Sequence, residues 1–145
     1  MRTYACTSRH LMKATILAVL ASVAMASKIS IIPKDSSDIT AKKYEVTLVS
    51  DDNIGISHVD SIEFTPPGVS AAYVFYSKIN RSNYGNDYWY GERHDGTGQA
   101  NFLQSTSTDV LTGSISTEDF VYSLSTMADG GFLIQAQNVR DFPYD

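Results

Sequence analysis

Hydrophobic and polar residues alternate along most of the chain after residue 27, a pattern typical of β-strands that bury one face. In the segment 44–49, Tyr44, Val46 and Leu48 fall on one face of such a strand. The segment 72–76 is apolar or aromatic on both faces, which indicates a central strand. The pattern predicts strands at 28–32, 44–49, 54–64, 72–76 and 132–137, and a further short strand that opens at 102–103. We therefore expect a mainly β protein of about five to seven strands, either an antiparallel β-sandwich or a barrel-like domain.

At 117–127 a helical pattern competes with a strand pattern. The segment 116–119 carries hydroxyl and carboxylate side chains of the kind that cap a helix N-terminus. Phe120, Leu124 and Met127 follow at helical spacing, although the run that begins at Phe120 also has high strand propensity. We expect one short helix here, with a strand as the alternative.

A cluster of aromatic residues lies in a polar, glycine-containing segment at 80–101, which we interpret as one long connection. Tyrosine and tryptophan beside amide and charged side chains can stack on a sugar ring or anchor a protein interface. The alternative is a hairpin whose aromatic rings pack against the sheet. The candidate ligand-binding residues are Tyr84, Tyr88, Trp89, Tyr90 and Arg93.

The first 26 residues have the pattern of a secretory signal peptide. Three basic residues precede an apolar run at 14–24, and small residues at 24 and 26 make a cleavage site before Ser27. The run is about half the length that spans a bilayer, which argues against an N-terminal anchor helix. We expect a secreted protein that does not insert into a membrane after cleavage. After the signal peptide at 1–26, we expect an N-terminal strand and polar linker at 27–43 and a single β domain at 44–145.

Removal of this signal peptide changes the charge and the cysteine content. Residues 27–145 keep 8 of the 11 basic residues and all 16 acidic ones, so the net charge falls from −5 to −8. The single cysteine, Cys6, is lost with the leader. A secreted domain without cysteine has neither disulfides nor cysteine-ligated zinc. The acidic balance argues against a nucleic-acid partner.

The sequence Asn80-Arg81-Ser82 is an acceptor motif for N-glycosylation. Asn80 is therefore a candidate glycosylation site on the surface of a secreted eukaryotic protein. The alternative is a chance occurrence, because such tripeptides are common.

Few residues suggest catalysis or metal binding. His58 and Asp60 would share one face of a strand, and His94 from a loop could complete a metal site. The alternative is two unconnected histidines, since no ligand spacing here is diagnostic. The chain has no G-x-S-x-G nucleophile motif. Glu63 and Glu92, which have aromatic residues nearby, are the candidate acids for flanking a glycosidic bond. We expect no cofactor and no enzymatic activity.

Several segments resemble the CHRD family, the extracellular β module first described in chordin. The matching segments are 44–48, 56–60, 67–69, 73–75, 111–120 and 131–137. His58 matches the first histidine of the family's H-I-H motif, whereas Asp60 replaces the second and Gln137 replaces the histidine of the last motif. The resemblance implies an antiparallel β domain with a binding or matrix role and without enzyme activity.

The sequence thus favours a secreted, non-enzymatic β domain that binds an extracellular protein or belongs to a matrix or cell wall. The first alternative is a carbohydrate-binding module that uses Tyr88, Trp89 and Tyr90 on a polysaccharide. The second alternative is a small metal-dependent or hydrolytic enzyme that uses His58, Asp60 and His94.

Overall fold

A computed structural model describes residues 27–34, 42–50 and 55–141 of the chain, so the signal-peptide prediction for 1–26 lies outside the described residues. No helix among the described residues is long and apolar enough to cross a membrane. The described elements are β1 (Lys28–Pro33), β2 (Lys43–Ser50), η1 (Ile56–His58), β3 (Ser61–Phe64), β4 (Tyr73–Asn83), β5 (Asn86–Glu92), β6 (Gln99–Ser105), β7 (Leu111–Ser116), β8 (Phe120–Thr126), β9 (Phe132–Asn138) and η2 (Val139–Asp141).

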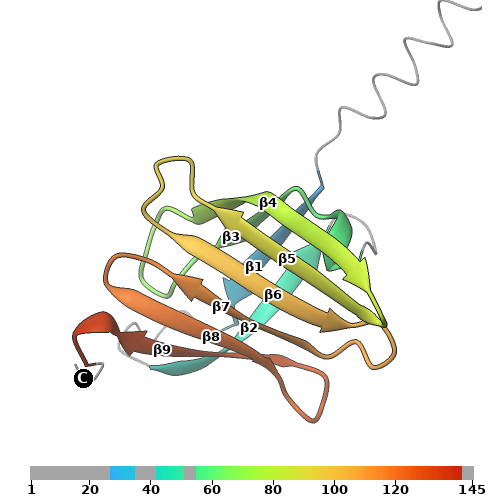
Figure 1. Cartoon of the computed structure of the whole chain (residues 1–145). Helices are drawn as coiled ribbons and strands as arrows, with labels where there is room; N and C mark the ends of the chain where they lie inside the picture. Colours follow the sequence, from blue (N-terminus) through green and yellow to red (C-terminus); the bar gives the residue numbers. More distant parts are fainter. Residues whose placement is uncertain (1–26, 35–41, 51–54, 142–145) are drawn as a thin grey trace, which may run out of the picture.

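The nine described strands close into one barrel in the order β1-β2-β9-β8-β7-β6-β5-β4-β3 (Figure 1). From β3 to β9, each strand pairs antiparallel with the next strand along the chain. β1 completes the wall, because it pairs antiparallel with β2 and parallel with β3. The mainly β, barrel-like prediction is confirmed. Among the described strands, closure gives every strand a hydrogen-bonded neighbour on both sides along at least part of its length, which limits strand-to-strand aggregation.

The barrel interior holds the hydrophobic core. Along most of the strands inward side chains alternate with outward ones, whereas residues 78–83 of β4 are all exposed. The largest fully buried side chains are Trp89, Phe64, Phe75, Phe102, Ile31, Ile62, Ile115, Ile134, Val46 and Val59. The rings of Phe64 and Tyr122 meet edge to face, with centroids 4.8 Å apart. This alternation, predicted from the sequence, therefore commits most of the apolar residues to the fold.

Two glycines make room for core aromatic rings. A Cβ at Gly91 would overlap the ring of Trp89 and lie 2.8 Å from the Tyr76 carbonyl oxygen. A Cβ at Gly113 would overlap the ring of Phe102, its cross-strand neighbour. Each large ring thus packs directly against the backbone of a glycine, which lets the interior pack densely.

The predicted helix at 117–127 is wrong, because β8 occupies most of this segment. Tyr122 and Leu124 point inward at a period of two, and β8 pairs with β7 and β9 on either side. The predicted cap forms a turn instead, in which Thr117 Oγ1 accepts a 3.3 Å hydrogen bond from the Phe120 backbone N–H. Positions four apart satisfy both periods, so the short apolar pattern could not separate helix from strand.

The strand predicted at 54–64 is partly wrong. Residue 54 lies outside the described residues. Within 55–64, residues 56–58 form the 3₁₀ turn η1, and only Ser61–Phe64 forms a strand. Ile56 and Val59 are both buried, and their spacing of three matches the 3₁₀ period.

The long connection predicted at 80–101 is also wrong, because β4 continues to Asn83 and β5 follows after a two-residue turn. Polar side chains hid this hairpin because they occupy its exposed positions.

Candidate functional site

The outer surface of β4, β5 and β6 carries a group of exposed hydrophobic side chains. Along β5, Tyr88 and Tyr90 point outward, while Asp87, Trp89 and Gly91 point inward. Tyr88 pairs with Arg81 on one side and Leu103 on the other, and Tyr90 pairs with Ile79 and Asn101. We call Ile79, Arg81, Tyr88, Tyr90 and Leu103 the aromatic face.

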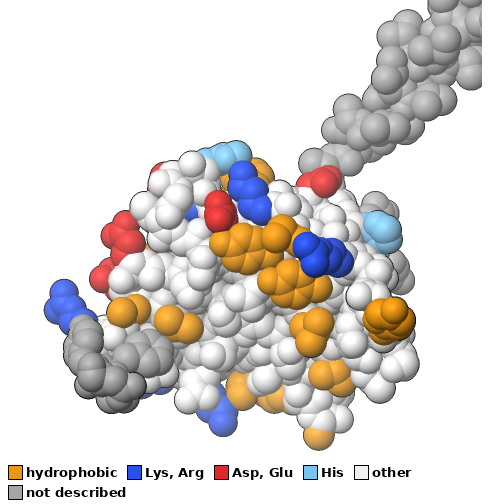
Figure 2. All heavy atoms as spheres, in the orientation of Figure 1, with side chains coloured by type: hydrophobic (Ala, Val, Ile, Leu, Met, Phe, Trp, Pro, Cys, Tyr) orange, Lys and Arg blue, Asp and Glu red, His pale blue; other side chains and the backbone are white. Residues whose placement is uncertain are grey.

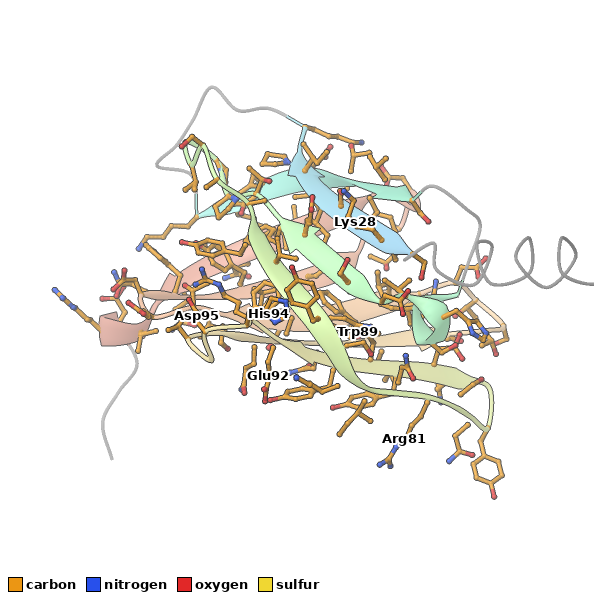
Figure 3. All side chains as sticks on the ribbon, turned by 90° about the horizontal axis from the view of Figure 1, so that it is seen from above. Lys28, Arg81, Trp89, Glu92, His94 and Asp95 are labelled. Carbon is orange, nitrogen blue, oxygen red and sulfur yellow. The ribbon has the colours of Figure 1, made fainter. Side chains whose placement is uncertain are left out.

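Exposure on the aromatic face is high for such large apolar side chains. The exposed fractions are 40% for Ile79, 38% for Tyr88 and 46% for Leu103. Figure 2 shows hydrophobic side chains gathered over this part of the barrel, with basic and acidic side chains at the margins. In Figure 3, Arg81 and Glu92 point to the same outer side of the wall, whereas Trp89 lies within the barrel.

Tyr84 lies at the tip of the β4–β5 hairpin and is 97% exposed. Its backbone φ is +47°, and that of the following Gly85 is +79°. Two positive φ values suit the right-handed twist of a two-residue hairpin, but tyrosine adopts this region at a cost that asparagine or glycine avoids. The tyrosine ring therefore gives the turn no evident stability.

Polar groups border the aromatic face at Tyr90. Its hydroxyl donates to Glu92 Oε1 at 2.9 Å and lies 3.1 Å from Gln99 Oε1. The hydrogen bond to the carboxylate raises the pKa of the Tyr90 hydroxyl, because it stabilises the protonated form. The phenol is thus held in place as a neutral group beside an amide and a carboxylate.

Trp89 does not belong to the surface site that the sequence suggested. Its side chain is fully buried, and its Nε1 donates a 2.8 Å hydrogen bond to the Val59 carbonyl oxygen. A stacking role for Trp89 on a ligand is therefore ruled out in this fold.

Arg93 is engaged at the end of β5 by its own loop. Its guanidinium lies 4.9 Å above the centre of the Tyr73 ring, and its Nη1 donates to Thr97 Oγ1 at 2.9 Å. Nη2 is 3.7 Å from the Asp95 carboxylate, whose pKa is lowered mainly by hydrogen bonds from Thr97. The structure thus assigns Arg93 to this loop and places Arg81 beside Tyr88.

The candidate metal ligands are held by separate contacts. Asp60 Oδ2 accepts a 3.0 Å hydrogen bond from the Ser27 backbone N–H, and His94 stacks on Tyr76 with ring centroids 3.7 Å apart. His58 belongs to η1 rather than to a strand. Within the described residues, no three His, Cys, Asp or Glu side chains lie together as metal ligands.

Asn80 is exposed on β4, and its Nδ2 donates to Ser77 Oγ at 3.2 Å. Its glycosylation stays a prediction.

Ile79 and Leu103 were missed by sequence reasoning as members of a site. They come from strands on either side of β5, so only the strand register joins them to Tyr88 and Tyr90. The outward alternation of β5 was the available signal, but it needed the hairpin to be recognised first.

Comparisons with protein-family models, curated proteins and solved structures find no match for this chain.

Proposed function

We propose that this protein is a secreted, non-enzymatic β-barrel that binds an extracellular protein through the aromatic face. The observation that carries the proposal is the exposure of Ile79, Tyr88 and Leu103 side by side on adjacent strands, next to Arg81. Clustered exposed apolar side chains mark interaction sites on soluble proteins. Tyrosine and arginine are enriched among the residues that dominate interface energetics.

The backbone of the aromatic face is held in place before binding. Tyr88 and Tyr90 project from β5, which is hydrogen-bonded to β4 and β6 along its length. Tyrosine also has few rotatable bonds, so a partner would order little of this surface on binding. A preformed surface of this kind supports specific rather than merely adhesive binding.

Tyr84 lies at the tip of the same β4–β5 hairpin. An almost fully exposed ring on a backbone of positive φ contributes little to the fold. Unfavourable backbone conformations concentrate at functional sites. We infer that Tyr84 is retained for contact with the partner.

A protein partner is favoured over a sugar by the aliphatic neighbours. Ile79 and Leu103 offer no flat ring for stacking, whereas both suit an apolar side chain of a partner. The burial of Trp89 also removes the ring best suited to a pyranose.

The test uses a benzophenone amino acid introduced at position 88, and at position 49 as the matched control. Val49 is 47% exposed on β2, at the far side of the barrel order from β5. After irradiation in extracellular fluid of the source organism, we expect one protein to crosslink at position 88 and not at position 49. That protein is then purified and its affinity measured.

Tyr88→Ala and Leu103→Ser are expected to weaken binding of the purified partner at least about tenfold, as for interface anchors. Val49→Ser is expected to leave the affinity unchanged. Equal crosslinking at both positions, or unchanged affinity in both face variants, would overturn the proposal.

A polysaccharide is the second candidate ligand, supported by Tyr90. Its ring lies beside the Glu92 carboxylate and the Gln99 amide, which are suitable hydrogen-bond partners for sugar hydroxyls. Depletion from solution by insoluble chitin, cellulose and β-1,3-glucan tests this candidate. If the protein binds one of these polysaccharides, and if this binding is lost in Tyr90→Ala and kept in Val49→Ser, the ligand is a glycan rather than a protein.

A further inference from the structure

A cavity opens at the end of the barrel where β9 runs into η2. Its volume is about 390 Å³, and ligand pockets in proteins usually measure about 300–1,000 Å³. Tyr44, Tyr122 and Ala136 line it from β2, β8 and β9, and Pro67 lines it from the β3–β4 connection. We call this space the mouth cavity.

The mouth cavity exists because the inward positions at this end of the barrel do not fill it. Ala136 pairs with Tyr122 across β8 and β9, so a methyl group stands where a larger side chain could close the space. Phe120, two residues before Tyr122, is still 37% exposed at the rim. The lining is therefore mostly aromatic and aliphatic, as in sites that bind small organic molecules.

Tyr44 adds one polar group that lacks a protein partner. Within the described residues, its Oη is the one buried side-chain polar atom without a hydrogen bond. Burial raises the pKa of the Tyr44 hydroxyl, so it remains a neutral donor. A buried hydroxyl without an acceptor is unfavourable, and an acceptor on a bound molecule would relieve it.

The charges at the rim offset each other. The positively charged Lys42 and the negatively charged Asp141 both line the mouth cavity. The site therefore favours neither an anion nor a cation.

We propose that the mouth cavity binds a small, uncharged, mostly apolar molecule with one oxygen that accepts a hydrogen bond from Tyr44. The cavity has the volume of about 13 liquid water molecules at roughly 30 Å³ each, so the ligand has a similar number of non-hydrogen atoms. This site lies on other strands than the aromatic face and does not depend on the function proposed for that face.

The experiment compares two flat probes of equal shape by isothermal titration calorimetry and ligand-observed NMR. 2-Acetylnaphthalene carries a carbonyl oxygen, and 2-isopropenylnaphthalene has a CH₂ group in its place. We expect the chain beginning at Ser27 to bind the ketone with a Kd below about 1 mM, a value typical of weak, fragment-sized ligands. The ketone is expected to bind about two- to tenfold more tightly than the hydrocarbon.

Two variants separate the hydrogen bond from the apolar site. Tyr44→Phe is expected to abolish the preference for the ketone while the affinity for the hydrocarbon stays the same. Ala136→Leu, which fills the cavity, is expected to weaken both probes at least about fivefold. Thermal unfolding of each variant without probe establishes that it is folded.

Three results would overturn the proposal. The first is that neither probe binds to the folded chain. The second is a ketone preference that survives in Tyr44→Phe. The third is binding that occurs only after residues 142–145 are deleted, which would assign the cavity to the chain's own C-terminal segment.

Discussion

At the scale of single residues, the position of Trp89 in the strand decides its role. Its indole ring and its polar neighbours in the sequence suit a binding surface. Its place between two outward tyrosines on β5, however, puts the ring inside the barrel. Gly91 leaves the space that the ring occupies, and Val59 accepts its hydrogen bond. A residue type therefore indicates a chemistry only once its face is known.

Trp89→Phe is expected to lower the free energy of unfolding by about 2–4 kcal/mol, measured by urea denaturation. The change removes core volume and leaves the buried Val59 carbonyl oxygen without its donor. Tyr88→Phe on the outer face is the control and is expected to change stability by less than about 0.5 kcal/mol. Equal effects of the two substitutions would contradict the assignment of Trp89 to the core.

Tyr122 links the barrel interior to alkaline unfolding. Burial, together with the nearby Tyr73 and Asp119, raises its pKa from 10.0 to about 12. Between pH 10 and 12 the unfolded chain therefore loses a proton that the folded chain keeps, and stability falls as the pH rises through this window. We expect the urea midpoint to decline less steeply above pH 10 in Tyr122→Phe. Parallel declines in the two proteins would contradict this prediction.

At the scale of elements, the β4–β5 hairpin shows where local pattern was insufficient. β4 contains a shift in register between Ser77 and Ile79, after which Ile79 pairs with Tyr90. The shift interrupts the alternation along β4, and the polar residues beyond it resemble a loop. The paired strand β5 restores the strand assignment, since hydrogen bonds to β6 continue along its whole length.

Tyr84→Asn is expected to raise the free energy of unfolding by about 0.5–1 kcal/mol, because asparagine tolerates positive φ better than tyrosine. Thermal and urea denaturation measure the change. Gly85→Ala is the opposite control and is expected to destabilise, since φ is +79° at that position. A loss of stability in Tyr84→Asn would show that the ring supports the fold.

At the scale of the whole molecule, β1 completes the barrel by joining β2 to β3. Its start is tied to the 58–60 region. The Ser27 backbone N–H donates to Asp60 Oδ2 at 3.0 Å, and the Ser27 hydroxyl donates to the His58 carbonyl oxygen at 2.6 Å. Cleavage before Ser27 would turn the hydrogen bond between the Ser27 nitrogen and Asp60 into a contact between an ammonium and a carboxylate.

A chain that begins at Ser27 is therefore expected to be more stable with a free amino group than with an acetylated one. The expected difference at pH 6 is about 0.5 kcal/mol, the value of an exposed ion pair. Asp60→Asn is expected to remove the difference, and high salt is expected to reduce it. Equal stability of the free and acetylated chains would contradict the predicted contact.

The sequence by itself determined the class of the fold and much of the interior. Alternation at 44–49 and 132–137 identified strands with a buried face, and both segments lie in the barrel wall. It also identified the hairpin tyrosines as candidates for binding, because aromatic rings among polar residues form an unusual pattern.

Only the tertiary structure decided which rings face outward and how the wall closes. Alternation divides a strand into two faces, but the curvature and pairing of the whole sheet determine which face becomes the interior. The parallel pairing of β1 with β3, the juxtaposition of Tyr88 with Leu103 and the mouth cavity all join residues far apart in the sequence or on different strands. Such contacts depend on register and closure, which are properties of the assembled barrel rather than of any single segment.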